Sequence, residues 1–402
     1  MVSDNIGIVT VWADSGAGFV SQAYYNALKS NFNVKIYSRG SYTYDNNLPI
    51  WNFGDVTIDK SIDNPTSINK NIFVKWILDN KISLILFNEQ RFWKPILWAK
   101  ELGVKCVSYI DYYTAETINF FDLYDGLICN TQRHFSVFQN FKNTIYIPWG
   151  TDSNLFGLNR NYTKIDQVSF LHSAGLSGPN DRKGTKNLII AFANTIGKAI
   201  LYIDSQLPLT FYDNEIQDIV LKDSRIVFRN VTTVAPHNYK DAHVYVYPTR
   251  LEGIGLTIAE ALMSGMPVIT TNNPPMNEIV IDNYNGRLIN VDSYVSRYDG
   301  YYWPEAVINI KSLTSLIQFY IDNPSVIISH STNAIDKSLK ELNWEDNFQN
   351  ITSFISKTIL ANPANLDPYL IDKIHKYDKV NNPNGIDLFF SGLKKIIKKS
   401  VS

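Results

Sequence analysis

The feature that most constrains the fold is an alternation of short apolar runs with helical patterns, which occurs twice along the chain. In the first half, the apolar runs include "IGIVTVW", "NVKIYS", "ISLILFN" and "KCVSYI". The same rhythm starts again with "VSFLHSAG", "AILYID", "RIVFRNV" and "VYVYP". Strands that alternate with helices predict a parallel sheet covered by helices. We therefore expect two similar α/β domains, joined near residue 160 in the polar stretch "GLNRNYTKID".

Length and composition fit this organisation. A chain of 402 residues is too long for one compact core and suits two domains. With 45% hydrophobic and 19% charged residues, the composition is that of a globular protein. A formal net charge of -1 gives no global field that would attract nucleic acid, so any anion site must be local.

The cysteines and the hydropathy pattern indicate a soluble, cytoplasmic protein. Cys106 and Cys129 lie inside apolar runs, which favours reduced, buried thiols over a disulfide or a metal site. No apolar run approaches the roughly 18 residues that span a bilayer, and the N-terminus enters a strand without a basic leader.

The first turn between a strand and a helix contains two glycines. In "VWADSGAGFVSQAYYNAL", Gly16 and Gly18 would let a ligand approach backbone N–H groups at a positive helix end. A dinucleotide fingerprint would add a third glycine and an acidic residue about 20 positions later. Ser21 and Arg39 stand at those places. A tight turn that serves only packing is the alternative.

A basic turn precedes a helix in the second half. In "SAGLSGPNDRKGTKNLIIAF", Arg182 and Lys183 stand beside Gly184, just before the predicted helix. Two cations and free backbone donors at one place would suit a phosphate group. A solvated basic turn is the alternative.

The stretch "YVYPTRLEGIGLTIAEALMSGMPVITT" combines glycines with carboxylates. Gly253 and Gly255 would let a diphosphate or a sugar lie against the start of a helix near Leu256. Phosphate repels carboxylates, so Glu252 and Glu260 instead suit hydroxyl groups on either side of the diphosphate. This pattern predicts a binding site for a nucleotide sugar. An ordinary capped amphipathic helix would account for Glu260 alone.

These motifs resemble those of the retaining GT-B glycosyltransferases of family four, whose E-x7-E mark reads "EGIGLTIAE" here. The resemblance extends through "IPWGTDSNLF", "RKGTKNLIIAF", "EALMSGMPVITTN" and "DNYNGRLI", and is strong over residues 145–290. It implies two Rossmann-like domains whose parallel sheets face a central cleft. The implied divisions are an acceptor-side domain at 1–160, a nucleotide-sugar-binding domain at 161–343, a helix crossing back to the first domain at 344–361, and a linker with a basic tail at 362–402.

The resemblance also implies roles for particular residues. Glu252 would contact the donor sugar and Glu260 the ribose, while Arg182 and Lys183 would neutralise the diphosphate. The other donor-side candidates are Gly16, Gly18, Gly253, Ile254, Gly255, Leu256 and His172. A hexose would move from a UDP- or GDP-linked donor to a hydroxyl on a glycan, lipid-linked or protein acceptor. The anomeric configuration would be retained and no metal would be required, since the chain contains no Asp-x-Asp.

The chain departs from the family pattern in its first half. Where the family commonly has a histidine after the fourth strand, this chain reads "SYIDYYTAE". Asp111 therefore becomes the catalytic candidate there, with Glu89 and Tyr112 as further contacts for the acceptor. His134 is expected to be structural or peripheral.

Two other functions stay open at this stage. An epimerase or phosphorylase on the same architecture would share the phosphate site. A catalytically silent partner subunit that binds a glycosylated protein would be a binding protein and not an enzyme. Such a subunit would have no physical need for Glu252, Glu260, Arg182 and Lys183.

The C-terminal stretch "GIDLFFSGLKKIIKKSVS" predicts an amphipathic helix at residues 385–402. Such a helix can lie in a membrane interface, with its lysines attracted to anionic lipid. A helix packed on the protein body is the alternative. The apolar face would contain Ile386, Phe389, Phe390, Leu393, Ile396 and Ile397, and the basic side Lys394, Lys395, Lys398 and Lys399.

Overall fold

The structure is a computed structural model, and it describes residues 4–39, 49–60, 67–158, 160, 164–177, 179–362 and 366–381. The chain forms two compact units. The first unit comprises the described residues within 1–129, 137–147 and 348–402. The second unit comprises those within 130–136 and 148–347.

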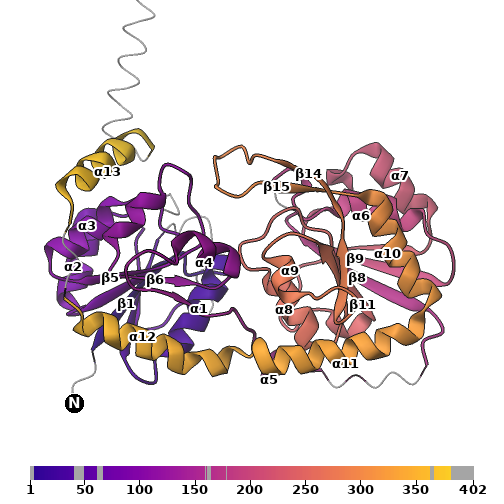
Figure 1. The fold of residues 1–402 in the computed structure, drawn as a ribbon, viewed down its shortest axis with the longest axis horizontal. Helices are drawn as coiled ribbons and strands as arrows, with labels where there is room; N and C mark the ends of the chain where they lie inside the picture. The colour runs from indigo at the N-terminus through magenta and orange to yellow at the C-terminus, as the bar shows by residue number, and fades with distance from the viewer. Residues whose placement is uncertain are drawn as a thin grey trace, which may run out of the picture. The chain divides into compact units, whose positions relative to one another are not determined.

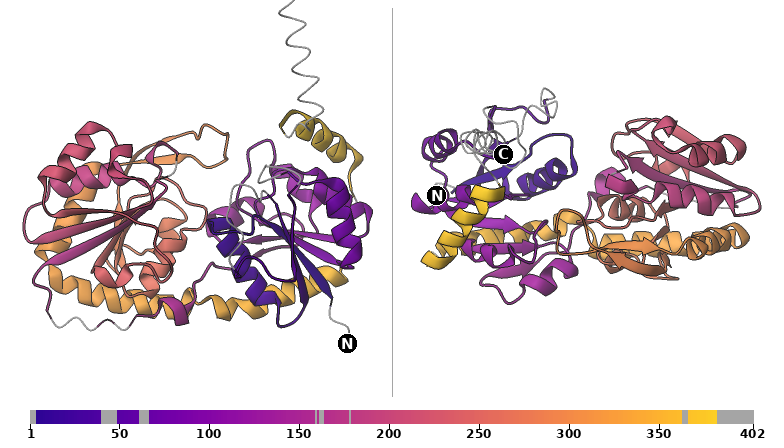
Figure 2. Two further views of the ribbon diagram at one scale, coloured as in Figure 1. Left: turned by 180° about the vertical axis from the view of Figure 1, so that it is seen from behind. Right: turned by 90° about the horizontal axis from the view of Figure 1, so that it is seen from above.

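The described part of the first unit contains a parallel sheet of seven strands, in the order β3-β2-β1-β4-β5-β6-β7. Helix α1 packs beside α12, and α2 beside α3. Helices thus lie on both faces of the sheet (Figures 1 and 2). The strands are Asn5–Thr10 (β1), Asn33–Ser38 (β2), Val56–Ile58 (β3), Leu84–Phe87 (β4), Lys105–Tyr109 (β5), Gly126–Cys129 (β6) and Thr144–Tyr146 (β7). The helices are Gly16–Leu28 (α1), Lys70–Asp79 (α2), Lys94–Glu101 (α3), Ile118–Leu123 (η1), Phe348–Leu360 (α12) and Pro368–Asn381 (α13), and Gln132–Phe138 (α4) spans the change of unit.

The described part of the second unit contains a parallel sheet of six strands, in the order β10-β9-β8-β11-β12-β13, and a separate antiparallel pair, β14-β15. The strands are Val168–Gly175 (β8), Ala199–Ser205 (β9), Ile226–Asn230 (β10), Val244–Tyr247 (β11), Val268–Thr271 (β12), Gly286–Ile289 (β13), Val291–Val295 (β14) and Glu305–Ile308 (β15). The α-helices are Ser153–Phe156 (α5), Thr185–Ala193 (α6), Asn214–Lys222 (α7), Leu256–Met263 (α8), Met276–Ile279 (α9), Ile310–Asp322 (α10) and Pro324–Glu341 (α11). The 3-10 helices are Pro179–Asp181 (η2), Leu209–Phe211 (η3), Tyr239–Asp241 (η4) and Trp344–Asn347 (η5).

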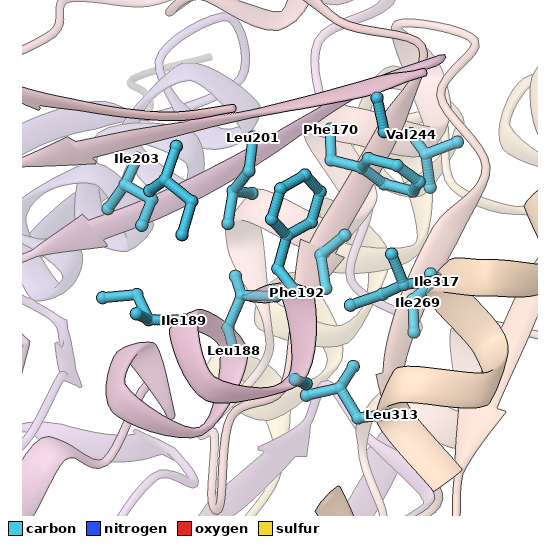
Figure 3. Packing of buried hydrophobic residues seen from close by; sticks show 14 of the residues in the cluster. Phe170, Leu188, Ile189, Phe192, Leu201, Ile203, Val244, Ile269, Leu313 and Ile317 are labelled. Carbon is cyan, nitrogen blue, oxygen red and sulfur yellow. The ribbon is translucent and has the colours of Figure 1, made fainter. Parts of the chain in front are cut away.

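Successive strand residues in the second unit face opposite sides of its sheet, as the pleat requires. Phe170 of β8 belongs to an apolar cluster with Leu188 of α6 and Leu313 of α10, which Figure 3 shows from close by. The next residue, Leu171, belongs to a second cluster with Leu262 of α8. The strands are therefore buried on both faces, which explains their continuous apolar runs and fixes the positions of their carboxyl ends.

Several helices begin at side chains that accept hydrogen bonds from first-turn N–H groups. Asn69 caps α2, Asp213 caps α7 and Asn309 caps α10. Each cap satisfies donors that have no partner inside the helix.

The two parallel sheets confirm the predicted pair of Rossmann-like domains. Helix α12 groups with the first unit, as the family resemblance implied. The change of unit, however, occurs at Pro148 and not near residue 160. Trp149 lies against Trp344, with ring centroids 4.3 Å apart, and the N–H of Thr151 donates to the carbonyl of Leu342 at 2.6 Å. These contacts place residues after 148 in the second unit before the polar stretch begins.

The interpretation of residues 362–402 as a linker and tail is wrong for the part that forms α13. Asp378 in this helix is fully buried and accepts hydrogen bonds from the N–H groups of Trp93 at 2.9 Å and Lys94 at 2.8 Å, at the start of α3. Those donors lie far away in the sequence, so no local pattern reveals this docking. The amphipathic segment predicted at 385–402 lies outside the described residues.

Both cysteines are free and buried, as predicted. Within the described ranges, no helix has the length and apolar character needed to cross a membrane.

Candidate active site

Helix α8 begins just after strand β11, at the carboxyl edge of the second sheet. Its N-cap residue, Gly255, has a φ of 84°, in the left-handed region that favours glycine. No side chain caps α8 within the described part of the chain. The N–H of Ile258 donates to the carbonyl of Gly255, so the N–H groups of Leu256 and Thr257 are those available to a ligand. The helix dipole favours an anion at this position.

The loop before α8 contains the predicted backbone contacts. A Cβ added at Gly253 would meet nothing within 4 Å, so the chain is open to a ligand there. Ile254, between Gly253 and Gly255, is buried, with only 6% of the residue exposed. Leu256 follows as the first residue of α8. The structure thus brings Gly253, Ile254, Gly255 and Leu256 to one place.

Glu252 lies in the same loop and is held as a carboxylate. Its Oε1 accepts hydrogen bonds from Arg182 Nη1 at 2.7 Å, Thr249 Oγ1 at 2.8 Å and the Tyr247 phenol at 3.0 Å. Burial by itself raises the pKa of Glu252, but Arg182, Lys183 and the two hydroxyl donors together lower it below its ordinary value. Within the described residues Oε2 makes no hydrogen bond, so it can accept one from a ligand hydroxyl.

Arg182 is bound to this loop. Its Nη1 also donates to the carbonyl of Leu251, and Glu252 is the main cause that raises the pKa of Arg182. A partly buried guanidinium beside a carboxylate pairs with it, so the charge of Arg182 is already matched by Glu252. Arg182 positions Glu252.

Lys183, unlike Arg182, has no ion-pair partner among the described residues. Its Nζ makes no hydrogen bond or ion pair in the part of the chain that the structure describes, and it lies 6.0 Å from the centre of the Tyr247 ring. Burial lowers the pKa of Lys183, although the nearby Glu252 opposes this shift. An anionic ligand would compensate the cost of this partly buried ammonium.

The backbone donors next to Lys183 are already occupied, contrary to prediction. Asp181 accepts hydrogen bonds from the N–H groups of Thr185 at 3.2 Å and Lys186 at 2.9 Å, at the start of α6. The N–H groups of Lys183 and Gly184 donate to backbone carbonyls. The open helix end belongs to α8 and not to α6.

Glu260 lies in α8 and has different partners from Glu252. It accepts a hydrogen bond from the phenol of Tyr239 at 2.7 Å, and Nε2 of His237 lies 3.6 Å from its Oε2. Burial raises the pKa of Glu260 to about 7, against the lowering effect of the Tyr239 hydrogen bond. The ring of His237 stacks near that of Phe156, with centroids 6.3 Å apart. Glu260 can therefore accept hydroxyl groups and can also titrate near neutral pH.

Arg133 ties the loop of Glu252 to a distant segment, and the sequence indicated no role for it. Its Nη2 donates to the carbonyl of Glu252 and its Nη1 to the carbonyl of Pro274 at 2.6 Å. Next to it, His134 is buried against the backbone of Gly253, and burial lowers the pKa of His134 well below its ordinary value. His134 is thus structural, as predicted.

His172 is not placed for donor binding. It is fully buried, with Nδ1 2.8 Å from the carbonyl of Val246 and Nε2 2.9 Å from the hydroxyl of Thr185. Burial lowers its pKa to about 4. Since both ring nitrogens are occupied, His172 serves to join β8, β11 and α6.

The two glycines of the first unit have separate roles. Gly18 is buried, its N–H donates to the Ser15 hydroxyl at 3.1 Å, and an added Cβ would lie 1.9 Å from the carbonyl oxygen of Ala13. Gly18 is therefore required for packing, which was the alternative interpretation. Gly16 is exposed, and an added Cβ would meet nothing within 4 Å. Of the two, only Gly16 presents a surface to a ligand.

The acceptor-side candidates lie at the carboxyl edge of the first sheet. Glu89 follows β4 and has a φ of 52°, which is unusual for a residue other than glycine. The buried Arg39 donates to the carbonyls of Asn88 at 2.5 Å and Glu89 at 2.7 Å, and so holds this conformation.

Asp111 follows β5 and interacts with Glu89. Burial, and then the charge of Glu89, raise the pKa of Asp111 to about 7, against the effect of Arg91. The guanidinium of Arg91 lies 3.7 Å from the centre of the Tyr112 ring. The structure thus brings together the predicted residues Glu89, Asp111 and Tyr112.

Sequence reasoning missed the side chains that orient the two glutamates. Tyr247 and Thr249 stand in the quoted motif, five and three residues before Glu252, and Tyr239 lies on the segment leading into β11. Their hydroxyl groups were the available signal, but only the fold shows which carboxylate each one contacts. Among the described residues, no group of three or more His, Cys, Asp or Glu side chains is arranged to hold a metal ion.

The segment that contains this site matches a known protein family. Residues 180–296, which include Glu252, Lys183 and Glu260, match the family described as "Glycosyl transferases group 1". The lipopolysaccharide core biosynthesis mannosyltransferase LpsB of Rhizobium meliloti is 34% identical over 76 residues. That match covers 18% of this chain and 22% of the relative, so the chain spans about a fifth of that protein's length.

Solved structures share the fold over most of the chain. Sucrose-phosphate synthase from Thermosynechococcus elongatus matches with a TM-score of 0.69 at 17% identity, over 89% of this chain and 100% of that one. HepE of Anabaena in complex with UDP and glucose matches with a TM-score of 0.64 at 15% identity, over 89% of this chain and 99% of that one. The pneumococcal O-GlcNAc transferase GtfA in complex with UDP and GlcNAc matches with a TM-score of 0.64 at 12% identity, over 90% of this chain and 100% of that one. The two parallel-sheet units thus share the GT-B fold of these structures, and within them residues 180–296 resemble the glycosyl transferases group 1 family.

Proposed function

We propose that the protein transfers a hexose from a nucleoside diphosphate sugar to a hydroxyl acceptor, with retention of the anomeric configuration. The observation that carries this proposal is the convergence of Glu252, Lys183 and the uncapped start of α8 at one edge of the second sheet. Hydroxyl-accepting and phosphate-binding groups are thereby placed together. We propose a donor linked to UDP or GDP, and the UDP and glucose held by the fold neighbour HepE support the UDP-linked form.

Each group has a distinct part in donor binding. The free Oε2 of Glu252 accepts a hydroxyl of the donor sugar, and Glu260 accepts hydroxyls of the ribose. Lys183 and the N–H groups at the start of α8 bind the diphosphate. Arg182 keeps Glu252 ionised and oriented.

Catalysis is mainly electrostatic. When the bond between the anomeric carbon and the phosphate oxygen breaks, negative charge grows on the leaving diphosphate. Lys183 and the helix end stabilise that charge, and such preorganised groups are usually the largest catalytic contribution. The acceptor hydroxyl then bonds to the anomeric carbon, and its proton passes to an oxygen of the leaving diphosphate. On the first unit, Asp111 and Glu89 are the proposed contacts for this hydroxyl. We place the reaction in the cytoplasm.

Product analysis tests the reaction class. The protein is incubated with UDP- and GDP-sugars, with and without an alcohol acceptor, and the products are followed by proton NMR. Transfer predicts a new glycoside of the same anomeric configuration, formed only when the alcohol is present. An epimerised nucleotide sugar, or a sugar phosphate made from added phosphate, would assign the alternative activities. Turnover should persist in EDTA, because Lys183 and α8 supply the positive charge.

A further inference from the structure

The first unit contains a groove of about 1140 Å³ between helix α13 and η1. Aromatic side chains from both elements line it. Tyr377 of α13 packs edge-on against the buried Phe120 of η1, with ring centroids 5.3 Å apart. Tyr369, at the start of α13, is 65% exposed and presents its ring at the surface of the groove.

Acidic and basic side chains line the groove in equal number. Lys376 is paired with Asp372 at 2.5 Å, and Lys373 Nζ lies 4.6 Å from the centre of the Tyr369 ring. The groove therefore has no excess of positive charge to select an anion. Amide groups from Asn119 and Asn381 add neutral donors and acceptors. The charged lining residues are Glu116, Asp122, Lys142, Asp367, Lys373 and Lys376.

This chemistry suits carbohydrate better than lipid. The apolar faces of sugar rings pack on aromatic rings, while sugar hydroxyls bond to carboxylates and amides. An acyl chain would leave those polar groups buried without partners, which costs free energy. The volume also exceeds the range of about 300–1,000 Å³ that is usual for small-ligand pockets, so the groove has room for several sugar rings.

Contacts of α13 connect the groove to the segment that carries one of the acceptor-side candidates. Asp378 of α13 caps the start of α3, and α3 follows the segment that contains Glu89. The phenol of Tyr377 lies within electrostatic reach of Arg91 and Tyr112. We infer that the groove is an acceptor subsite that holds a neutral oligosaccharide whose reactive end reaches Asp111 and Glu89. This inference rests on the proposed function, since it names the acceptor of that reaction.

The test measures oligosaccharide binding by the full chain. A glycan array that carries neutral gluco-, galacto- and manno-oligosaccharides together with sialylated glycans identifies a probe. Calorimetry then compares that probe's affinity for the wild type, Tyr369→Ala and Tyr369→Phe. We expect a neutral probe, a loss of roughly tenfold in Tyr369→Ala, and wild-type affinity in Tyr369→Phe, which keeps the ring. Tyr298→Ala is the matched control, because Tyr298 is 74% exposed and lies outside the groove.

Several results would overturn the inference. The first is equal affinity of the probe for the wild type and Tyr369→Ala. The second is binding only to sialylated glycans or to phosphatidylglycerol vesicles. The third is a sample that still binds UDP or GDP but binds no neutral glycan. A failure of the proposed function can be distinguished from a failure of this inference. If the ring-dependent glycan binding is present but no nucleotide sugar is turned over, the groove remains an oligosaccharide site and the transfer reaction is refuted.

Discussion

Arg182 and Lys183 are neighbours in the sequence, but they occupy different electrostatic environments. Arg182 donates to Glu252 and to a backbone carbonyl, whereas Lys183 has no ion-pair partner in the described part of the chain. An arriving diphosphate would therefore gain more from Lys183 than from Arg182. The two residues should respond differently to substitution, which sequence spacing alone could not have indicated.

Lys183→Ala should reduce turnover by about 10²–10³-fold, because the charge on the leaving diphosphate loses its stabilising cation. The measurement is nucleoside diphosphate release at saturating donor. Lys186→Ala is the matched control, since Lys186 lies three residues further along and its ammonium already pairs with Asp213 at 2.6 Å. Equal losses in both variants would show that Lys183 has no special role.

Donor binding should depend on pH through Glu260. Its pKa is raised by burial from 4.5 to about 7, so the carboxylate that accepts ribose hydroxyls forms only as the pH rises through about 7. Affinity for UDP or GDP, measured by calorimetry, should increase over that range. Tyr239→Phe removes a hydrogen bond that lowers this pKa, so the midpoint should move to higher pH.

The same shift has a consequence for stability. Because the folded pKa of Glu260 lies above its ordinary value of 4.5, the folded state binds the proton more tightly. This contribution to stability is fully present below pH 4.5 and is lost as the pH rises through about 7. Glu260→Gln should abolish both dependences. A pH profile identical to the wild type in that variant would contradict the assignment.

At the scale of elements, the start of α8 differs from those of α2, α6, α7 and α10. Asn and Asp side chains cap α2, α7 and α10, and Asp181 occupies the first N–H groups of α6. Helices α6 and α8 both begin at a left-handed glycine, but no side chain in the described part of the chain accepts from the first N–H groups of α8. The sequence predicted the α8 site from Gly-x-Gly, but it also predicted an open α6, since Asp181 does not reveal its cap without the turn that folds it back.

Gly255→Ala should lower the free energy of unfolding by about 1 kcal/mol, because an L-residue is strained at a φ of 84°. The added Cβ itself would lie 3.3 Å from the flexible end of Ile258, so most of the cost is in the backbone. Urea unfolding measures this change. Gly253→Ala provides the comparison, since nothing lies within 4 Å of its Cβ and its effect should be close to zero. A similar stability for the two variants would refute the backbone argument.

Helix α13 should depend on one buried carboxylate. Asp378→Ala leaves the N–H groups of Trp93 and Lys94 without their partner, at a cost of roughly 2 kcal/mol. Hydrogen exchange should report faster exchange of the α13 amides. Asp372→Ala, on the same helix, removes only an exposed pair with Lys376 and should leave exchange unchanged. Wild-type protection in the Asp378 variant would mean that other contacts hold the helix.

At the scale of the whole molecule, the two parallel sheets were predictable because apolar strand runs and helical periods are local patterns. The unit boundary and α13 were not, since they depend on Trp149 meeting Trp344 and on Asp378 meeting α3, across long separations in the sequence. The donor side of the site follows from one continuous motif. Its orienting groups, Tyr239 and Arg133, come from other segments and required the fold.

The most direct test of the central claim is nucleoside diphosphate release from a panel of UDP- and GDP-sugars, measured for the wild type and Glu252→Gln. The side-chain amide of this variant could still accept the Thr249 and Tyr247 hydrogen bonds, so thermal unfolding should confirm that the variant is folded. We predict release from at least one nucleotide sugar by the wild type, and a fall of about 10²-fold or more in the variant, which lacks the carboxylate that holds the donor sugar. No release from any member of the panel, or equal rates in the two proteins, would contradict the account.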